Sequence, residues 1–434
     1  MTELKTRRKS PPFRVGEKAS FSILASAELH DPVHENICSS RWCKIKKTMI
    51  KAFQYRLYPT SSQRKLMEST IETCRRFYND CLAERKEAYK ERKESIGKFA
   101  QLRKVKKLKE TNPYASKIHS HVLQVTVTDL DKAFQSFFKR VKAGEKPGYP
   151  RFKGEDRFDS FGFKEYGNGF KVDGRRLRLS GIGRVAIRWH RPLEGEIKTL
   201  RITRKAGKWY ASFACEVAEK SLPETGCAVG VDVGISSLIA TSNGELIENP
   251  KWYRDGQAVL RVLQRTVSRR KKGGSNRKKA VHALQVHHEH IANQRKDYLN
   301  KLANELIVNN DLIAIEDLRI QNIVKNHHLS RSILDGGWGY FAQRLSDKAA
   351  EAGREVVKVN PAYTSKTCSG CGMIFEDLDL SVRWIACDCG LSLNRDVNAS
   401  INILKRALQN RVGQTRWELT WAVAPCVSQE APAL

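Results

Sequence analysis

The chain has 434 residues, and its 78 Lys and Arg against 47 Asp and Glu give a formal net charge of +31. Self-repulsion of this size destabilises a compact protein, so we expect a polyanionic partner, above all a nucleic acid. No run of about 18 apolar residues could cross a membrane, and residues 1–10 lack the apolar segment of a signal peptide. The sequence therefore predicts a cytoplasmic protein without a membrane partner.

The positive charge is concentrated towards the N-terminal half. Residues 49–154 hold 25 basic and 11 acidic side chains, whereas residues 227–434 hold 28 and 21. Residues 251–301 are an exception within the second half, with 14 basic and 3 acidic side chains. We expect the polyanion to lie mainly against residues 49–154.

Weak hydrophobic periodicity marks both ends of the chain. Residues 1–48, which contain Pro11-Pro12, and the near-neutral residues 410–434 are predicted to be disordered extensions. Cys38 and Cys43 lie in the first extension, but their spacing is too loose to indicate a zinc-binding pair.

A strand and two long helices are predicted for residues 50–141. Apolar and polar residues alternate over Ile50–Leu57, and Ser61 can begin a helix whose periodicity continues to Leu108. A second helix is predicted over His121–Val141. It has an apolar stripe typical of core packing, formed by Leu123, Val127, Leu130, Phe134 and Phe138.

Alternating patterns after Gly154 predict a β-rich region. Basic and apolar residues alternate over 175–179 and 199–204, which gives each strand one core face and one cationic face. A barrel that contacts phosphates would use such strands, and an ordinary solvated strand face has the same pattern. The five predicted strands are Phe158–Phe170, Arg176–Leu179, Arg184–Trp189, Ile197–Arg204 and Trp209–Val217.

From Cys227 the pattern changes to an α/β order. Two apolar strands, Ala228–Gly234 and Leu312–Glu316, are separated by two short meander strands and a helical stretch that breaks at Gly273-Gly274. The remaining elements are predicted as a helix over 338–352, a strand over 355–359 and a helix that starts near Asp396. This order is compatible with a mixed central sheet flanked by helices.

Three acids occupy ends of these elements. Asp232 and Glu316 lie at the ends of apolar strands, and Asp396 begins a helix. In one cleft they would repel one another unless cations lay between them. Paired Mg²⁺ or Mn²⁺ ions would meet that need and align water for attack on a phosphate. Taken singly, each acid is better explained as a surface or capping residue.

The residues around these acids resemble the three split motifs of the RuvC-like nuclease domain, in the form found in TnpB proteins. The motifs are Gly230–Ile235 (GVDVGI), Ile315–Leu318 (IEDL) and Asn394–Ser400 (NRDVNAS). TnpB proteins are transposon-encoded RNA-guided nucleases related to type V CRISPR effectors. The similarity runs from about Met49 to about Leu404. Further matching pieces are Phe53–Pro59, Arg76–Asn79 (RFYN), Gly148–Phe152 (GYPRF), Ser268–Lys272 (SRRKK), Gly337–Trp338 and Thr364–Gly372.

The resemblance implies that Asp232, Glu316 and Asp396 are catalytic acids that bind Mg²⁺ (or Mn²⁺). It implies a guide RNA that selects double-stranded target DNA beside a short flanking motif, and successive cutting of both strands. The sequence does not define the oligomeric state. The side chains expected to contact nucleic acid are Tyr78, Asn79, Arg151, Arg269, Arg270, Lys271 and Lys272.

The same resemblance implies a multidomain α/β and β architecture. A RuvC/RNase H-like α/β nuclease domain would carry an inserted zinc ribbon, and an N-terminal β-barrel would be interrupted by a helical recognition domain. The expected bounds are 49–59 and 143–226 for the wedge-like barrel, 60–142 for the recognition domain, 227–365 and 391–409 for the nuclease domain, and 366–390 for the ribbon.

Four cysteines predict a structural zinc site. Cys368 and Cys371 form a C-x-x-C pair followed by glycine, typical of a zinc knuckle. Cys387 and Cys389 form a C-x-C pair where the family has C-x-x-C, so the second half cannot form the usual knuckle turn. A vestigial ribbon with free thiols is the alternative.

The basic stretch 251–301 also holds a histidine cluster. His287, His288 and His290 lie on a predicted helix, where the first and third share a face. Glu289 is the one acidic neighbour, so a solvated surface facing nucleic acid is favoured over a metal site.

Two other functions are compatible with the sequence. A compact type V CRISPR effector would differ mainly in the source of its guide RNA. A guide-dependent DNA-binding repressor would lack cleavage, and the intact acid triad argues against it. A neighbouring repeat array would favour the CRISPR effector, and a transposon end beside the gene would favour TnpB.

Overall fold

The computed structural model describes residues 48–379 and 381–412. The predictions for residues 1–47 and 413–434, including those for Cys38 and Cys43, lie outside the described residues. Within the described ranges, no helix is both long enough and apolar enough to cross a membrane.

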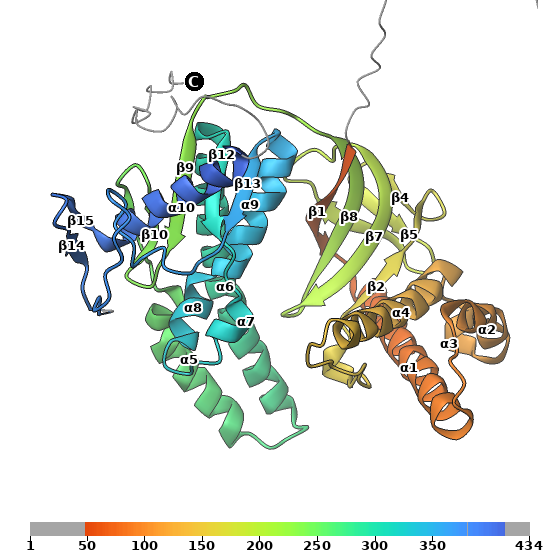
Figure 1. The fold of residues 1–434 in the computed structure, drawn as a ribbon. Helices are drawn as coiled ribbons and strands as arrows, with labels where there is room; N and C mark the ends of the chain where they lie inside the picture. The colour runs from red at the N-terminus through yellow and green to blue at the C-terminus, as the bar shows by residue number, and fades with distance from the viewer. Residues whose placement is uncertain (1–47, 380, 413–434) are drawn as a thin grey trace, which may run out of the picture. The chain divides into compact units, whose positions relative to one another are not determined.

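The first half of the described chain forms an eight-stranded sheet in the order β2-β7-β8-β1-β6-β5-β4-β3 (Figure 1). β1 is first in sequence but lies in the middle, antiparallel to both β6 and β8. The edge strands β2 and β3 are consecutive in sequence, so the sheet nearly closes into a barrel. The strands are β1 (Thr48–Tyr58), β2 (Ser160–Phe163), β3 (Glu165–Tyr166), β4 (Gly169–Asp173), β5 (Arg176–Leu179), β6 (Gly183–Arg188), β7 (Glu196–Lys205) and β8 (Lys208–Ala218).

Alternating side chains fill the interior of this sheet, as the sequence predicts. Phe53, Tyr55 and Leu57 of β1 are each at most 2% exposed. On β8 every second residue is buried, because successive side chains of a strand point to opposite faces. The β8 residues concerned are Trp209, Ala211, Phe213, Cys215 and Val217.

Four helices follow β1 and share the core of this sheet. α1 (Ser61–Arg92) begins with a capping box at Thr60. The prediction of continuous helix to Leu108 is wrong, because Lys93 adopts a left-handed backbone (φ 53°) that ends α1 and a new helix begins after Gly97. The other helices are α2 (Lys98–Thr111), α3 (Pro113–Ser116) and α4 (Ser120–Lys142), and a 3-10 turn follows at Glu155–Arg157.

The predicted apolar stripe of α4 is confirmed over most of its length. Leu123, Val127, Leu130 and Phe134 are buried in the core shared with the sheet. Phe138 is 57% exposed, so the prediction of core packing is wrong at this position. Burial on α4 ends at Phe134, against whose ring Phe138 stacks on the surface.

The second half forms a five-stranded mixed sheet in the order β11-β10-β9-β12-β13. β9, β12 and β13 are parallel, while β10 and β11 continue from β9 as an antiparallel meander. This arrangement confirms the predicted α/β order. The strands are β9 (Ala228–Val233), β10 (Ser237–Thr241), β11 (Leu246–Glu248), β12 (Leu312–Glu316) and β13 (Glu355–Val359).

Helices cover both faces of the mixed sheet (Figure 1). α6 (Ser275–Asn309) and α9 (Trp338–Ala352) pack against one face, and α10 (Arg395–Val412) packs against the other. α5 (Trp252–Arg269) forms a hairpin with α6 across the predicted break at Gly273-Gly274. Two short helices, α7 (Ile320–Ile323) and α8 (Ser330–Gly336), precede α9 and were not predicted.

The segment between β13 and α10 is mostly irregular over its described residues, 360–379 and 381–394. These residues include a hairpin of β14 (Trp384–Ala386) and β15 (Ser392–Asn394), which the sequence pattern did not predict. The hairpin ends directly before α10, so the cysteine-containing segment is attached to the same helix that carries Asp396.

Candidate active site

Adjacent parallel strands bring Asp232 and Glu316 together. β9 and β12 pair with Gly230 opposite Ala314 and Val231 opposite Ile315, so Glu316 is next in line with Asp232. Side chains alternate along a strand, so both carboxylates lie on the sheet face that includes Ala314. That face packs against α10.

Glycines stand on either side of Asp232 for two different reasons. A Cβ at Gly230 would lie 2.0 Å from the Ser400 carbonyl oxygen, so any larger side chain would displace α10 from β9. A Cβ at Gly234 would lie 2.7 Å from the Ser237 carbonyl oxygen, so this glycine is required by the turn into β10. The first glycine of the G-x-D-x-G pattern is therefore explained by the packing of α10, and the second by the turn.

The start of α10 fixes the position of Asp396. The side-chain oxygen of Asn394 accepts a hydrogen bond from the Asp396 backbone N–H at 2.8 Å, as an N-cap does. A carboxylate in the first helical turn is also stabilised by the helix dipole. Arg395, only 7% exposed, donates to the Asp379 carbonyl and ties the preceding segment to the helix.

Burial and mutual repulsion oppose ionisation of this acid cluster. Burial raises the pKa of Asp232 from 3.8 to about 8, and the carboxylates of Glu316 and Asp396 add to the increase. Burial also raises the pKa of Glu316, although a hydrogen bond from Thr364 works in the opposite direction. The predicted convergence of the three acids is thus visible both in the strand register and in the electrostatics.

This donor set fits a hard divalent cation. Carboxylate oxygens are the ligands that Mg²⁺ and Mn²⁺ prefer, and a cation would cancel the repulsion that raises the pKa of Asp232. A cavity of about 200 Å³ adjoins Glu316 and is lined in part by Trp338, Gln343 and Lys358. The end of β12 is therefore open on a side that α10 does not cover.

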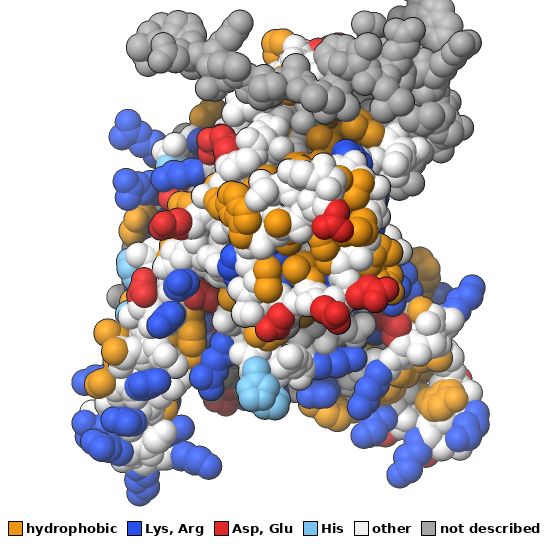
Figure 2. Space-filling view, turned by 60° about the vertical axis from the view of Figure 1, so that its left-hand side comes forward, with side chains coloured by type: hydrophobic (Ala, Val, Ile, Leu, Met, Phe, Trp, Pro, Cys, Tyr) orange, Lys and Arg blue, Asp and Glu red, His pale blue; other side chains and the backbone are white. Residues whose placement is uncertain are grey.

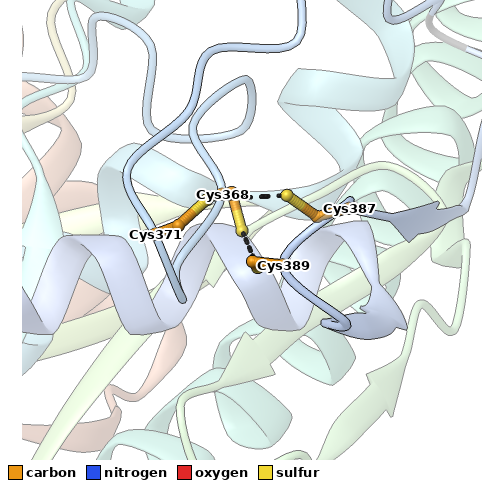
Figure 3. Close-up of side chains that lie close together, drawn as sticks. All are labelled: Cys368, Cys371, Cys387 and Cys389. Atoms are coloured by element: carbon orange, nitrogen blue, oxygen red, sulfur yellow. Dashed lines mark hydrogen bonds between the residues drawn. The ribbon is translucent and has the colours of Figure 1, made fainter.

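The four predicted cysteines converge (Figure 3). Their sulfur atoms all lie within 4.8 Å of one another, with Cys368 3.7 Å from Cys389 and Cys371 3.5 Å from Cys387. Zn–S bonds of about 2.3 Å in a tetrahedron require sulfur separations of about 3.8 Å. The C-x-C half thus reaches tetrahedral spacing, and the thiols fit a zinc ion.

The backbone around the cysteines supports this interpretation. Burial opposes ionisation of Cys368, but N–H groups of Cys371 and Gly370, together with the thiols of Cys387 and Cys389, lower the pKa of its thiol to about 7. The Cys389 N–H lowers the pKa of Cys387, but the neighbouring thiols raise it to about 12, so without a metal ion the cluster favours ionisation of one thiol at the expense of another. A Cβ at Gly370 would lie 3.3 Å from the Cys389 sulfur, so glycine keeps space beside the thiols. Thiolate is the form that binds zinc.

Buried polar residues of α10 hold the loop before the cysteines. Asn402 donates to the carbonyls of Thr364 and Thr367 at 2.9 and 2.6 Å. Asn398 donates to the Thr367 carbonyl and accepts from the Ser369 N–H, both at 2.7 Å. The sequence analysis missed these contacts, although two asparagines spaced i and i+4 on the predicted helix were an available signal.

Three family models match parts of the chain. They are described as "Helix-turn-helix domain" (residues 49–94), "Probable transposase" (212–327) and "Cas12f1-like, TNB domain" (338–403). The last two together include the three acids and the four cysteines. Over residues 49–94 the structure contains β1 followed by the single long helix α1.

Two curated relatives match over most of their length. "Putative RNA-guided DNA endonuclease" of Streptomyces pristinaespiralis is 39% identical over 368 residues, which cover 82% of this chain and 89% of the relative. "Putative RNA-guided DNA endonuclease InsQ" of Escherichia coli (strain K12) is 32% identical over 378 residues, which cover 82% of this chain and 92% of the relative. The chain belongs to the TnpB family.

A solved structure shares the fold of this TnpB chain. The protein in "Cryo-EM structure of the Cas12f1-sgRNA-target DNA complex" aligns with a TM-score of 0.53 and 13% identity, over 82% of this chain and 98% of that one. At this identity the likeness concerns the fold, which is mixed α/β with the barrel-like sheet.

Two side chains predicted to contact nucleic acid in this TnpB chain have roles inside the protein. Tyr78 is 5% exposed, with the Lys153 ammonium 5.8 Å from its ring centre. Asn79 exchanges hydrogen bonds with the backbone of Lys153 at 2.8 and 3.0 Å. Arg151, in the same segment, is exposed. Nucleic-acid contact by these residues stays a prediction.

The other predicted contacts lie where α5 turns into α6. Arg269, Arg270, Lys271 and Lys272 are all exposed there, and their contact with nucleic acid likewise stays a prediction. Figure 2 shows Lys and Arg gathered on the lower parts of one face of the molecule, with hydrophobic and acidic side chains at its centre.

The histidine cluster lies further along α6. The rings of His287 and His290 are 6.5 Å apart, and the intervening Glu289 is only 4% exposed. Lys208 and Tyr210 donate to its carboxylate at 3.0 and 3.2 Å, so Glu289 is already engaged and does not complete a metal site with the histidines.

Proposed function

We propose that this TnpB chain is an RNA-guided DNA endonuclease that cuts with a single RuvC-like site. The observation that carries the proposal is the convergence of Asp232, Glu316 and Asp396 from two strands and a helix, with the pKa of Asp232 raised to about 8. Its relatives are named as RNA-guided DNA endonucleases, which supplies the substrate class.

In this proposal the three carboxylates hold a pair of Mg²⁺ or Mn²⁺ ions. When bound, the ions supply an activated water and neutralise charge on the phosphate that is cut. The chain positions the ligands through the strand register and the close contact of Gly230 with α10, so little rearrangement of the ligands is needed. A single such site implies that the two DNA strands are presented in turn.

Charge indicates where the nucleic acids lie. Residues 49–154 carry +14, and we assign residues 60–142 to recognition of the guide RNA and its duplex with the target. The barrel-like sheet, residues 49–59 and 143–226, is assigned to a wedge-like domain. Guide pairing would then supply most of the sequence specificity, with a short flanking DNA motif read by the protein.

The cysteine segment, residues 366–390, is assigned to a structural zinc ribbon inserted in the nuclease domain of residues 227–365 and 391–409. Four thiolates fill a tetrahedral coordination sphere and leave no open position for chemistry. The zinc would therefore stabilise the segment rather than take part in hydrolysis.

The test is to purify the protein with RNA transcribed from its own locus, sequence that RNA, and supply matching plasmid DNA with Mg²⁺. We expect Glu316→Gln to reduce cleavage by about 1,000-fold or more while guide-dependent binding is retained. Asp317→Asn is the matched control, because Asp317 is the next residue and its side chain is 66% exposed. A Glu316→Gln protein that cuts at a near wild-type rate would overturn the site assignment.

The same experiment separates the alternatives. A repressor would bind the matched plasmid and leave it intact with wild-type Glu316. A type V CRISPR effector would cut with the same acids, but its RNA would map to a repeat array rather than to a transposon end.

A further inference from the structure

Thr364 contacts the candidate catalytic acid directly. Its side-chain hydroxyl donates to Oε1 of Glu316, and the residue is 3% exposed. The Pro361 carbonyl lies 3.0 Å from the same hydroxyl. The hydroxyl has one proton, and the carboxylate is the stronger acceptor, so the hydrogen bond to Glu316 is favoured.

Helix α10 determines where Thr364 lies. Asn402 donates to the Thr364 carbonyl at 2.9 Å, and Arg406, one turn further on, donates to the carbonyls of Asn360 and Ala362 at 2.9 and 2.6 Å. The backbone of the loop is therefore held by the helix through contacts that do not involve the Thr364 hydroxyl. The proton of that hydroxyl can be given to Glu316 while the helix still holds the loop.

The arrangement links two acids that are 80 residues apart in sequence. Asp396 lies in the first turn of α10, and the later turns of that helix hold the loop from which Thr364 reaches Glu316. Movement of α10 would shift Asp396 together with the Thr364 hydroxyl that contacts Glu316. Such linkage suits a site in which two ligands must keep their spacing to within about 0.5 Å.

We propose that Thr364 is a positioning residue that orients the Glu316 carboxylate for divalent cations and couples it through α10 to Asp396. The inference rests on the proposed function for the identity of the reaction. An outer hydrogen-bond partner fixes the rotamer of a ligand, and loss of such a partner typically lowers metal affinity or activity about 10–100-fold.

The test compares Thr364→Val, which removes the hydroxyl at nearly constant volume, with Thr364→Ser, which keeps it. Single-turnover cleavage by the guide-loaded protein is measured against Mg²⁺ concentration. We expect Thr364→Val to raise the half-saturating Mg²⁺ concentration about tenfold or more, and Thr364→Ser to stay within about threefold of wild type. Guide-dependent DNA binding should be unchanged in both.

Thr367→Val is the matched control in the same loop. The Thr367 hydroxyl donates to the Tyr363 carbonyl at 2.8 Å and touches no carboxylate. Its substitution should leave the Mg²⁺ dependence unchanged. Equal shifts for Thr364→Val and Thr367→Val would overturn the proposal in favour of a general effect on the loop, and so would a wild-type Mg²⁺ dependence for Thr364→Val.

Mn²⁺ binding provides a readout that does not depend on cleavage. The electron paramagnetic resonance signal of free Mn²⁺ is followed as guide-loaded protein is added. The same titration with Glu316→Gln protein measures Mn²⁺ binding outside the acid site, including binding to RNA, and is subtracted. We expect Thr364→Val to need about ten times more Mn²⁺ than wild type to reach half of the binding that Glu316→Gln lacks. A wild-type protein that cuts no DNA would overturn the function, whereas undiminished Mn²⁺ binding by Thr364→Val would overturn the role of Thr364.

Discussion

The acid cluster and the cysteine cluster lie at opposite ends of the short loop that runs from Thr364 to Cys368. The two clusters are assembled in different ways. The acids come from β9, β12 and α10 and span 165 residues of sequence, whereas the four cysteines lie within 22 residues. The acids are half-buried at the ends of two sheet strands and at the start of a helix, while Cys371 and Cys389 are exposed on mostly irregular backbone.

This difference indicates what each cluster requires from a metal ion. The acid site is positioned by a hydrophobic core that exists without a cation, so a cation there mainly relieves repulsion. The cysteine segment has one two-stranded hairpin and few buried apolar residues, among them Ile385. Such a segment depends on a metal for its structure, because zinc binding supplies folding free energy that a small core lacks.

The largest expected loss of folding free energy comes from removing one of the four cysteines that we assign to zinc. On this assignment Cys371→Ser should bind no zinc and should unfold residues 366–390, because structural zinc contributes about 10–16 kcal/mol in small zinc-binding peptides. Zinc content by mass spectrometry and limited proteolysis of the segment would measure this. Cleavage should fall more than about tenfold, because the loop that carries Thr364 continues into Cys368.

Ser381→Ala is the control for this substitution. Ser381 lies in the same segment, and its hydroxyl donates to Asp379 rather than to a sulfur. The Ser381→Ala protein should have the zinc content and the cleavage rate of wild type. A Cys371→Ser protein with full zinc content would show that the cluster does not hold zinc through four thiolates.

The next largest effect concerns the pH dependence of stability at the acid site. The pKa of Asp232 is about 8 in the folded chain against 3.8 ordinarily. Between about pH 4 and pH 8 the folded chain therefore holds a proton that the unfolded chain lacks, and the free energy of unfolding decreases as pH rises. Each unit of pKa difference contributes about 1.4 kcal/mol, so we expect a loss on the order of a few kcal/mol.

Asp232→Asn tests this expectation. In buffer free of Mg²⁺ and Mn²⁺, the variant should lose less stability than wild type between pH 5 and pH 8 in urea denaturation. Added Mg²⁺ should stabilise the wild type at pH 8 and have little effect on the variant. Identical pH slopes for the two proteins would show that Asp232 is not held in a repulsive, buried cluster.

The contrast between the clusters also explains what could be predicted from sequence. Local patterns drew attention to the three acids, because each lies at a strand end or a helix start, but their assignment to one site came from the resemblance of the surrounding motifs to the RuvC-like nuclease domain. Thr364 was missed because its contact with Glu316 joins residues 48 positions apart and follows no periodicity. Phe138 shows the same limit, since helical spacing does not reveal which turns a neighbouring element covers.

The C-x-C pair is an intermediate case. Its spacing argued against a knuckle turn, but the β14–β15 hairpin provides another turn, in which the Cys387 N–H donates to the Leu391 carbonyl at 2.9 Å and the Gly390 N–H donates to the Cys387 carbonyl. This turn carries Cys389 to within reach of Cys368. The C-x-x-C spacing describes the usual turn that brings two cysteines to one zinc ion, and the β14–β15 hairpin brings the C-x-C pair there by a different turn.

The smallest expected effect lies at the junction of the two clusters. The Lys405 ammonium donates to the Ser369 carbonyl, which anchors the cysteine end of the loop to α10, while Asn402 anchors the Thr364 end. Lys405→Met keeps the aliphatic stem of the side chain and removes this hydrogen bond. We expect the free energy of unfolding to fall by about 1 kcal/mol or less, and zinc to exchange faster with a chelator. Cleavage should stay within about threefold of wild type, because the contact between Thr364 and Glu316 is untouched. If Lys405→Met instead reduced cleavage as strongly as Cys371→Ser, the two ends of the loop would act as one rigid unit, and the zinc cluster would position the nuclease acids directly.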